Sequence, residues 1–87
     1  KIIMEEKLIG KIIHYFGKIQ VAIIELTSVI KQGDKIHIKS ANTDFEQEID
    51  SMQIDHANVQ TAKKGDSIGI KIDEKVREGD EVYLILP

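Results

Sequence analysis

The chain contains no cysteine and no tryptophan, and it has a single proline among its 87 residues. The absence of cysteine excludes a disulfide scaffold and a cysteine-based zinc site, and it is typical of proteins from a reducing compartment. No apolar run approaches the roughly 20 residues of a membrane-spanning helix, and the opening stretch is too short for a signal-peptide core. We therefore expect a cytoplasmic protein that has no membrane partner.

Basic charge is also scarce relative to acidic charge, since 12 Lys and Arg face 15 Asp and Glu, a formal net charge of −3. This balance provides no general attraction to nucleic acid. Charged residues still make up 31% of the chain, a proportion typical of heat-adapted cytosolic proteins. With two Phe and two Tyr, the core must consist mainly of Ile, which favours strands. The length predicts a single domain over residues 1–87.

Alternating apolar residues predict an all-β fold of about six strands, over residues 8–15, 18–26, 34–39, 44–55, 67–72 and 81–86. In the second strand the alternation places Ile19, Val21 and Ile23 on one face, which we expect to be the buried face. The phase of the fourth strand changes midway, which predicts a bend near Asp50–Ser51. Residues 58–62 are the one candidate for a helical turn.

One phrase occurs three times, as "IKQGDKIHI" at 30–38, "AKKGDSIGI" at 62–70 and "VREGDEVYL" at 76–84. Glycine permits the backbone of a tight turn, and aspartate can accept hydrogen bonds from amides there. Each copy therefore predicts a turn that leads into the third, fifth or sixth strand. The alternative, a metal or acid–base cluster of Asp34, Asp66 and Asp80, is weaker because each Asp already has a sufficient role in its turn.

Three longer stretches carry a resemblance to a known family: "FGKIQVAIIELTSVIKQGDKIHI", "IDSMQIDHANVQTAKKGDSIGIKI" and "VREGDEVYLI". Together they resemble the second domain of elongation factor Tu over about residues 10–86, and the whole chain is similar to stand-alone translation elongation factor-like proteins. The resemblance implies a small closed antiparallel β-barrel of six to seven strands. A related barrel also forms the C-terminus of U32-type peptidases.

The resemblance further implies a binding pocket, because in elongation factors this barrel helps to hold the aminoacylated 3′ end of tRNA. The pocket positions correspond here to Gln53, Asp55, His56 and Ser67. Of these, only His56 retains a residue type found in some members, so the pocket is altered. The GxxxxGK[ST] phosphate loop is absent, so we expect no binding of GTP by the chain on its own and no cofactor.

A second candidate site joins the first two predicted strands and consists of Lys11, His14, Tyr15, Phe16 and Lys18. Interleaved bases and aromatic rings can stack on single-stranded RNA and hold its phosphates. The alternative is a hairpin whose Phe16, together with Tyr15, caps one end of the barrel.

The three histidines, His14, His37 and His56, lie in separate segments without the spacing of a metal site, so no metal is expected. His37 alternates with Ile36 and Ile38 and is expected to face solvent. No serine has a histidine and aspartate in a catalytic arrangement, which predicts a non-enzymatic protein.

Two functions follow from these observations. The first is a translation-associated module that binds ribosomal RNA, tRNA or the ribosome, as the resemblance implies. The alternative is a protein-interaction module that docks onto a GTPase-like or U32 peptidase-like partner and has no role with RNA.

Overall fold

The structure, a computed structural model, describes residues 5–86 and consists of strands and turns in that range. The ten strands are β1 (Glu5–Phe16), β2 (Val21–Leu26), β3 (Ile30–Lys31), β4 (Lys35–Lys39), β5 (Asp44–Glu48), β6 (Met52–Ile54), β7 (Ala57–Val59), β8 (Thr61–Ala62), β9 (Ser67–Lys71) and β10 (Glu81–Leu86). The all-β class predicted from the sequence is confirmed. A helix long and apolar enough to cross a membrane is not found among the described residues.

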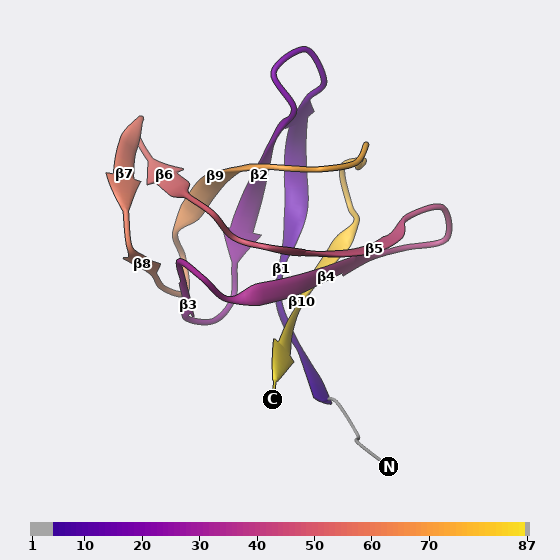
Figure 1. Cartoon of the computed structure of the whole chain (residues 1–87), viewed down its shortest axis with the longest axis horizontal. Helices are drawn as coiled ribbons and strands as arrows, with labels where there is room; N and C mark the ends of the chain where they lie inside the picture. The colour runs from indigo at the N-terminus through magenta and orange to yellow at the C-terminus, as the bar shows by residue number, and fades with distance from the viewer. Residues whose placement is uncertain (1–4, 87) are drawn as a thin grey trace.

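Eight of the strands form one antiparallel sheet in the order β5-β4-β10-β1-β2-β9-β6-β7, and β3 pairs separately with β8. The sheet curves strongly, and the β1–β2 hairpin rises at the top of the view in Figure 1. The first and last strands are neighbours, with Glu5 opposite Leu86. The edge strands β5 and β7 do not pair with each other. The prediction of a closed barrel is therefore wrong, although the all-β antiparallel architecture holds.

The sheet stays open between β5 and the β6–β9 side, where a single strand is predicted over residues 44–55. The chain instead forms two strands there, since β5 pairs with β4 whereas β6 pairs with β9 and β7. The break between them falls at residues 49–51, in agreement with the predicted bend. Across this gap the buried side chain of Gln47 donates a hydrogen bond to the carbonyl oxygen of Lys71 (2.9 Å) and accepts one from the amide of Asp73 (2.8 Å).

The helical turn suggested for residues 58–62 is also wrong, because residues 58–59 belong to β7 and residues 61–62 to β8. Asp55 and His56 form a two-residue turn with positive φ values of 52° and 66°. This turn brings Ala57 opposite Ile54, so that β7 runs back along β6. The local geometry therefore favours a hairpin over a helix.

The three Gly-Asp turns are confirmed, and they share one geometry. Gly33, Gly65 and Gly79 have φ values of 94°, 93° and 94°, which favour glycine over any other residue. The carboxylates of the following Asp residues accept hydrogen bonds from the amides of Lys31 (3.0 Å), Lys63 (3.0 Å) and Arg77 (2.9 Å). Each carboxylate thus serves its own turn, as the structural interpretation predicts.

Each turn is also bound to a buried residue that lies elsewhere in the chain. The Gly79 amide donates to the carbonyl of Ile12 (2.7 Å), and the Ile12 amide donates to the carbonyl of Asp80 (2.8 Å). The same reciprocal pair joins Gly65 and Asp66 to Leu26, and Gly33 and Asp34 to Ile49. The repeated phrase therefore recurs because the fold fastens three turns to its core in the same way.

The core lies on the concave, inner face of the sheet and consists mainly of isoleucine. Its fully buried side chains include Ile9, Ile12, Ile24, Leu26, Ile30, Ile36, Ile38, Ile49, Met52, Ile68, Ile70 and Ile72. In β2 the buried residues are Ala22, Ile24 and Leu26. The expected burial of Ile19, Val21 and Ile23 is therefore wrong by one residue, and these three side chains belong to the opposite face.

Candidate functional site

The outer face of the β1–β2 hairpin carries apolar side chains that the core does not use. Ile19 is 62% exposed and Phe16 is 44% exposed, whereas Val21 and Ile23 are half-buried. The face of β2 is fixed by its pairing, because Ile24 stands opposite Ile12 and Ile68, which are core residues. A one-residue difference in register exchanges the two faces of a strand, which explains the error in the prediction.

These side chains form one wall of a groove of about 380 Å³. The groove is lined by Phe16, Ile19, Val21, Ile23, Gln53, Asp55, His56, Ser67 and Gly69. The opposite wall comes from β6 and the turn that follows it. Between the walls, Gly69 of β9 lies opposite Ile23 on one side and Gln53 on the other. The groove thus runs between the β1–β2 hairpin and the β6–β7 turn, over a floor that lacks a side chain at Gly69.

Backbone strain is concentrated around this groove. Among residues 5–86, the non-glycine residues with positive φ are Gln20 (55°), Asp55 (52°) and His56 (66°). Asp55 and His56 line the groove, and Gln20 follows its wall residue Ile19. A left-handed backbone costs a residue other than glycine roughly 1–2 kcal/mol. The hairpin turn accounts for the values at Asp55 and His56, and it is their combination with the exposed apolar wall that makes the groove the candidate site.

The four pocket positions that the resemblance implied meet in this groove: Gln53, Asp55, His56 and Ser67. They come from β6, from the β6–β7 turn and from the start of β9. Gln53 also donates a side-chain hydrogen bond to Asn58 on β7 (3.1 Å). Within residues 5–86 no hydrogen bond joins the side chains of Ser67 and His56. In the described residues these two side chains thus do not form the hydrogen-bonded pair that activates a nucleophile.

The predicted RNA-binding set does not come together. Lys11 lies at a different cavity, shared with Leu8 and Glu81, and it stands opposite Glu81 and Glu25 in the sheet. Lys18 lies in the hairpin loop and does not line the groove. Because carboxylates flank Lys11, its position is unfavourable for a phosphate.

The two aromatic residues of the hairpin, which were expected to act together, have different surroundings. Tyr15 packs against the core, whereas Phe16 is 44% exposed and lines the groove. The His14 ring contacts the edge of the Phe16 ring, with centroids 4.4 Å apart, and its Nδ1 lies 3.5 Å from a Glu78 carboxylate oxygen. The groove contains no lysine or arginine among its lining residues and has one carboxylate, that of Asp55. It is suited to an apolar group and not to a polyanion.

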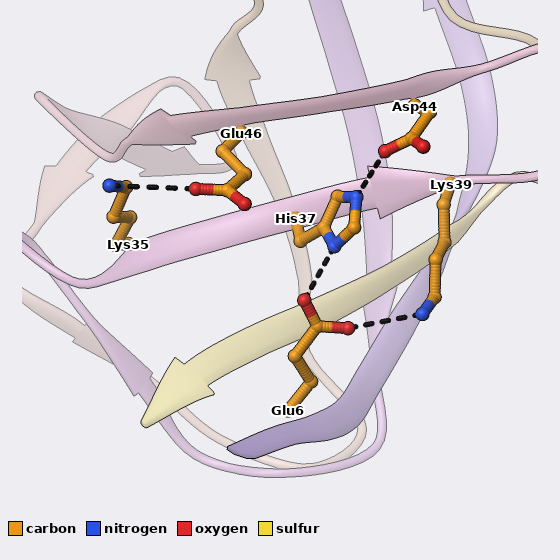
Figure 2. Close-up of polar contacts among 6 residues, drawn as sticks. All are labelled: Glu6, Lys35, His37, Lys39, Asp44 and Glu46. Atoms are coloured by element: carbon orange, nitrogen blue, oxygen red, sulfur yellow. Dashed lines mark hydrogen bonds and ion pairs between the residues drawn. The ribbon is translucent and has the colours of Figure 1, made fainter. Parts of the chain in front are cut away.

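A second polar cluster lies on the outer face of the sheet, centred on His37 (Figure 2). The Nδ1 atom of His37 is 2.6 Å from a Glu6 carboxylate oxygen, and its Nε2 bonds the carboxylate of Asp44. The side chain of His37 is only 13% exposed. The expectation that His37 simply faces solvent is therefore wrong, because three strands contribute groups that enclose it.

The charges in the His37 cluster stabilise one another. The hydrogen bond that His37 donates to the Asp44 carboxylate, aided by that to Glu6, raises the pKa of His37 above its usual 6.5. His37 and then Lys39, whose Nζ lies 3.1 Å from Glu6, lower the pKa of the Glu6 carboxyl below 4.5. A protonated His37 thus holds β1, β4 and β5 together. Sequence spacing could not reveal this cluster, since Glu6 precedes His37 by 31 residues.

Ligand atoms of Glu6, His37 and Glu46 lie within 4.8 Å of one another, a spacing that invites comparison with a metal site. Lys39 already pairs with Glu6, and Lys35 pairs with Glu46 at 3.5 Å. Both imidazole nitrogens of His37 also have carboxylate partners (Figure 2). A cation would have to displace these lysines and a proton, so the cluster is better explained as a structural clamp.

Comparison with known proteins identifies relatives that are named as proteases. The chain is 45% identical over 78 residues to an uncharacterized protease of Methanocaldococcus jannaschii, a match that covers 88% of this chain and 19% of the relative. It is 35% identical over 77 residues to a collagenase of Porphyromonas gingivalis, covering 86% of this chain and 21% of the collagenase. The chain thus spans about a fifth of the length of the curated relatives it matches. No family model matches the chain.

Two solved structures share the fold of this chain. The C-terminal domain of a protein described as a U32 peptidase from Geobacillus thermoleovorans superposes with a TM-score of 0.85 at 12% identity, over 90% of this chain and 91% of that domain. A selenomethionine variant of the domain gives 0.83 at 13% identity, over 87% and 96%. At such identities the likeness shows the fold alone.

These findings correct the resemblance inferred from the sequence. The relatives are proteases and collagenases, and the matching fold is a U32 peptidase C-terminal domain, so the assignment to elongation factor-like proteins is wrong. The associated role in translation, with binding of RNA or the ribosome, is wrong for the same reason. The structure is consistent with this correction. Lys11 and Phe16 line different cavities, and no lysine or arginine is among the described residues that line the groove, so the expected combination of bases and aromatic rings for RNA is not formed there.

Proposed function

We propose that the chain is a non-catalytic docking module that binds the peptidase part of a U32-type protease through the groove between the β1–β2 hairpin and the β6–β7 turn. The observation that carries this proposal is the exposed apolar wall of the groove, formed by Phe16 and Ile19 beside Val21 and Ile23. Contiguous apolar groups on the surface of a small domain mark interaction sites, because leaving them in water is unfavourable.

The relatives indicate what kind of partner covers this wall. Their names describe proteases, and a match of 19–21% of their length leaves most of each protein outside the region that resembles this chain. The remaining part of such a protease therefore offers a protein surface to a domain of this type. The groove's apolar wall and single carboxylate suit a protein surface of neutral or basic character.

A catalytic role for this chain has less support. Ser67, His56 and Asp55 share the groove, but Asp55 and His56 are consecutive residues of a tight turn. A triad requires hydrogen bonds from nucleophile to base and from base to acid, and none of these joins the three side chains in the described region. The module accordingly contributes binding, and the chemistry belongs to the peptidase part.

The test uses calorimetry with a version of the M. jannaschii relative from which the 78 matching residues have been deleted. Its folding is first checked by circular dichroism. We expect this version to bind the chain, and the intact relative to bind it much more weakly because its own copy occupies the surface. Ile19→Asp should weaken binding at least about tenfold, since it places a charge on the apolar wall.

Val29→Asp is the matched control. Val29 is 63% exposed, almost the same as Ile19 at 62%, but it lies beyond the far end of β2 and does not line the groove. Its substitution should leave the affinity unchanged. Equal losses in both variants would contradict docking through the groove, and no binding by the wild-type chain would contradict the proposed function itself.

A further inference from the structure

Gly69 occupies a strand position at which glycine has no structural necessity. A Cβ atom added to Gly69 would lie 3.4 Å from Cδ1 of Ile23 and 3.7 Å from Cγ1 of Val21, which is ordinary packing contact. Its φ is not among the positive values, unlike that of Gly33. By contrast, a Cβ at Gly10 would lie 2.4 Å from the Glu25 carbonyl oxygen, so Gly10 is required by close packing. Neither reason applies to Gly69.

A glycine inside a strand normally destabilises it, by roughly 0.5–1 kcal/mol relative to alanine. Such a glycine often marks a place where a ligand or another backbone approaches closely. Gly69 lies on the groove floor, between Ile23 on β2 and Gln53 on β6. Its missing side chain therefore leaves a gap in the outer face, directly beside the exposed apolar wall.

The size of the groove limits what can enter this gap. A volume of about 380 Å³ is near the lower end of the roughly 300–1,000 Å³ of ligand pockets. An α-helix about 10 Å wide needs a broader trough than this. An extended segment that inserts one large side chain fits better, because Gln53 on the β6 wall and Ser67 on β9 can bond its peptide groups.

The charge of the groove limits the chemistry of that segment. Asp55 carries the one carboxylate among the lining residues, which would repel a neighbouring carboxylate. The wall formed by Ile19, Ile23 and Phe16 favours an apolar side chain. An acidic segment is therefore disfavoured.

We propose that the gap over Gly69 is the anchor subsite for one large apolar side chain of leucine, methionine or phenylalanine type, presented by an extended segment of the peptidase part. This inference rests on the proposed docking function and specifies its recognition element. Gly69 then determines specificity, because its absent side chain provides the space for the anchor.

The first test measures folding and docking together in Gly69→Ala and Gly69→Leu. Gly69→Ala should melt at the same or a higher temperature than the wild type, because alanine fits the space and stiffens the strand. Its affinity for the truncated relative should nevertheless fall about tenfold, and that of Gly69→Leu about a hundredfold, as the anchor is displaced. The control is Gly17→Ala, whose added Cβ would meet Tyr15 at an ordinary 3.5 Å outside the groove. It should bind as the wild type does.

The second test needs no protease. The ¹⁵N-labelled chain is titrated with the capped tripeptides Ala-Leu-Ala and Ala-Glu-Ala at millimolar concentration. Ala-Leu-Ala should shift the amide resonances of Gly69 and Ile23, whereas Ala-Glu-Ala should not.

The outcomes separate the subsite from the docking function. Unchanged docking of Gly69→Ala, together with loss of docking in Ile19→Asp, would retain the function and overturn the subsite. Equal shifts from both peptides, or none at Gly69, would also overturn the subsite. If the wild-type chain does not dock at all, the proposed function fails and the peptide titration alone decides about Gly69.

Discussion

The two faces of strand β2 carry similar residues but have opposite surroundings. On the inner face Ala22 and Ile24 are fully buried, whereas on the outer face Ile23 is half-buried and Ile19, in the turn just before β2, is 62% exposed. Hydrophobic character therefore does not identify the core face of this strand. The pairing with β1 and β9 does so, and it leaves a second apolar face that the chain itself does not cover. The inner face maintains the fold, and the outer face is available for a partner.

Matched substitutions on the two faces give the largest expected difference. Ile24→Ala removes fully buried atoms and should lower the free energy of unfolding by about 2–5 kcal/mol. Ile19→Ala should change it by no more than about 0.5 kcal/mol. Denaturation by urea measures both. A loss above about 2 kcal/mol in Ile19→Ala would mean that the outer face is part of the core, and the comparison would fail.

The Gly-Asp turns extend the comparison, because their aspartate side chains are buried to different extents. Asp80 is 4% exposed, and its loss would leave the Arg77 amide without a partner in a partly buried site. Asp80→Ala should therefore lower the free energy of unfolding by about 1–3 kcal/mol.

Asp34→Ala removes the equivalent bond to the Lys31 amide in a more exposed turn, where water can replace it. Its effect should be smaller than that of Asp80→Ala when both are followed by thermal unfolding. Equal effects would show that burial does not distinguish the copies.

A small effect that depends on pH is expected on the outer face, from the His37 clamp. The pKa of His37 is raised above 6.5, so its contribution is complete below about pH 6.5 and is lost as the pH rises through the folded-state pKa. The pKa of Glu6 is lowered below 4.5, so its contribution is lost as the pH falls through that lower value. Because the Asp44 side chain is 78% exposed, solvent screening should keep the His37 effect below about 1 kcal/mol.

The measurement compares the melting temperatures of the wild type and His37→Gln between pH 5.5 and pH 9. The advantage of the wild type should shrink as the pH rises, because Glu6, Asp44 and Glu46 then face a neutral imidazole. A constant difference between the two proteins would indicate that His37 does not change its charge in this range.

The parts of the fold that the sequence predicted are those with local causes. The Gly-Asp turns were predictable because the glycine and the carboxylate act within four residues of each other. The face of β2 was not, because apolar residues occupy both of its faces and long-range pairing selects one. The closed barrel failed for a similar reason, since the separate pairing of β5 and β6 is not encoded in their alternation.

The candidate site was predictable only in part. Gln53, Asp55, His56 and Ser67 do meet in the groove, but they were found through a resemblance whose functional implication was wrong. The alternation and turns behind that resemblance specify strands, which unrelated functions can share. A physical signal for the groove was present in the run Val21-Ala22-Ile23-Ile24, which is apolar on both faces and so implies a second covered surface.

The side-chain bridge of Gln47 gives the sheet an uneven resistance to opening. Separating β1 from β10 would break a ladder of backbone hydrogen bonds along both strands. Separating β5 from the segment after β9 would break the two hydrogen bonds of the Gln47 side-chain amide. Rotation of a single side chain can therefore detach β5 from the segment after β9 while the remaining pairing is intact. We therefore expect solvent to reach the interior first by this route, and faster hydrogen exchange at the Asp73 amide than at amides of the β1–β10 ladder would show it.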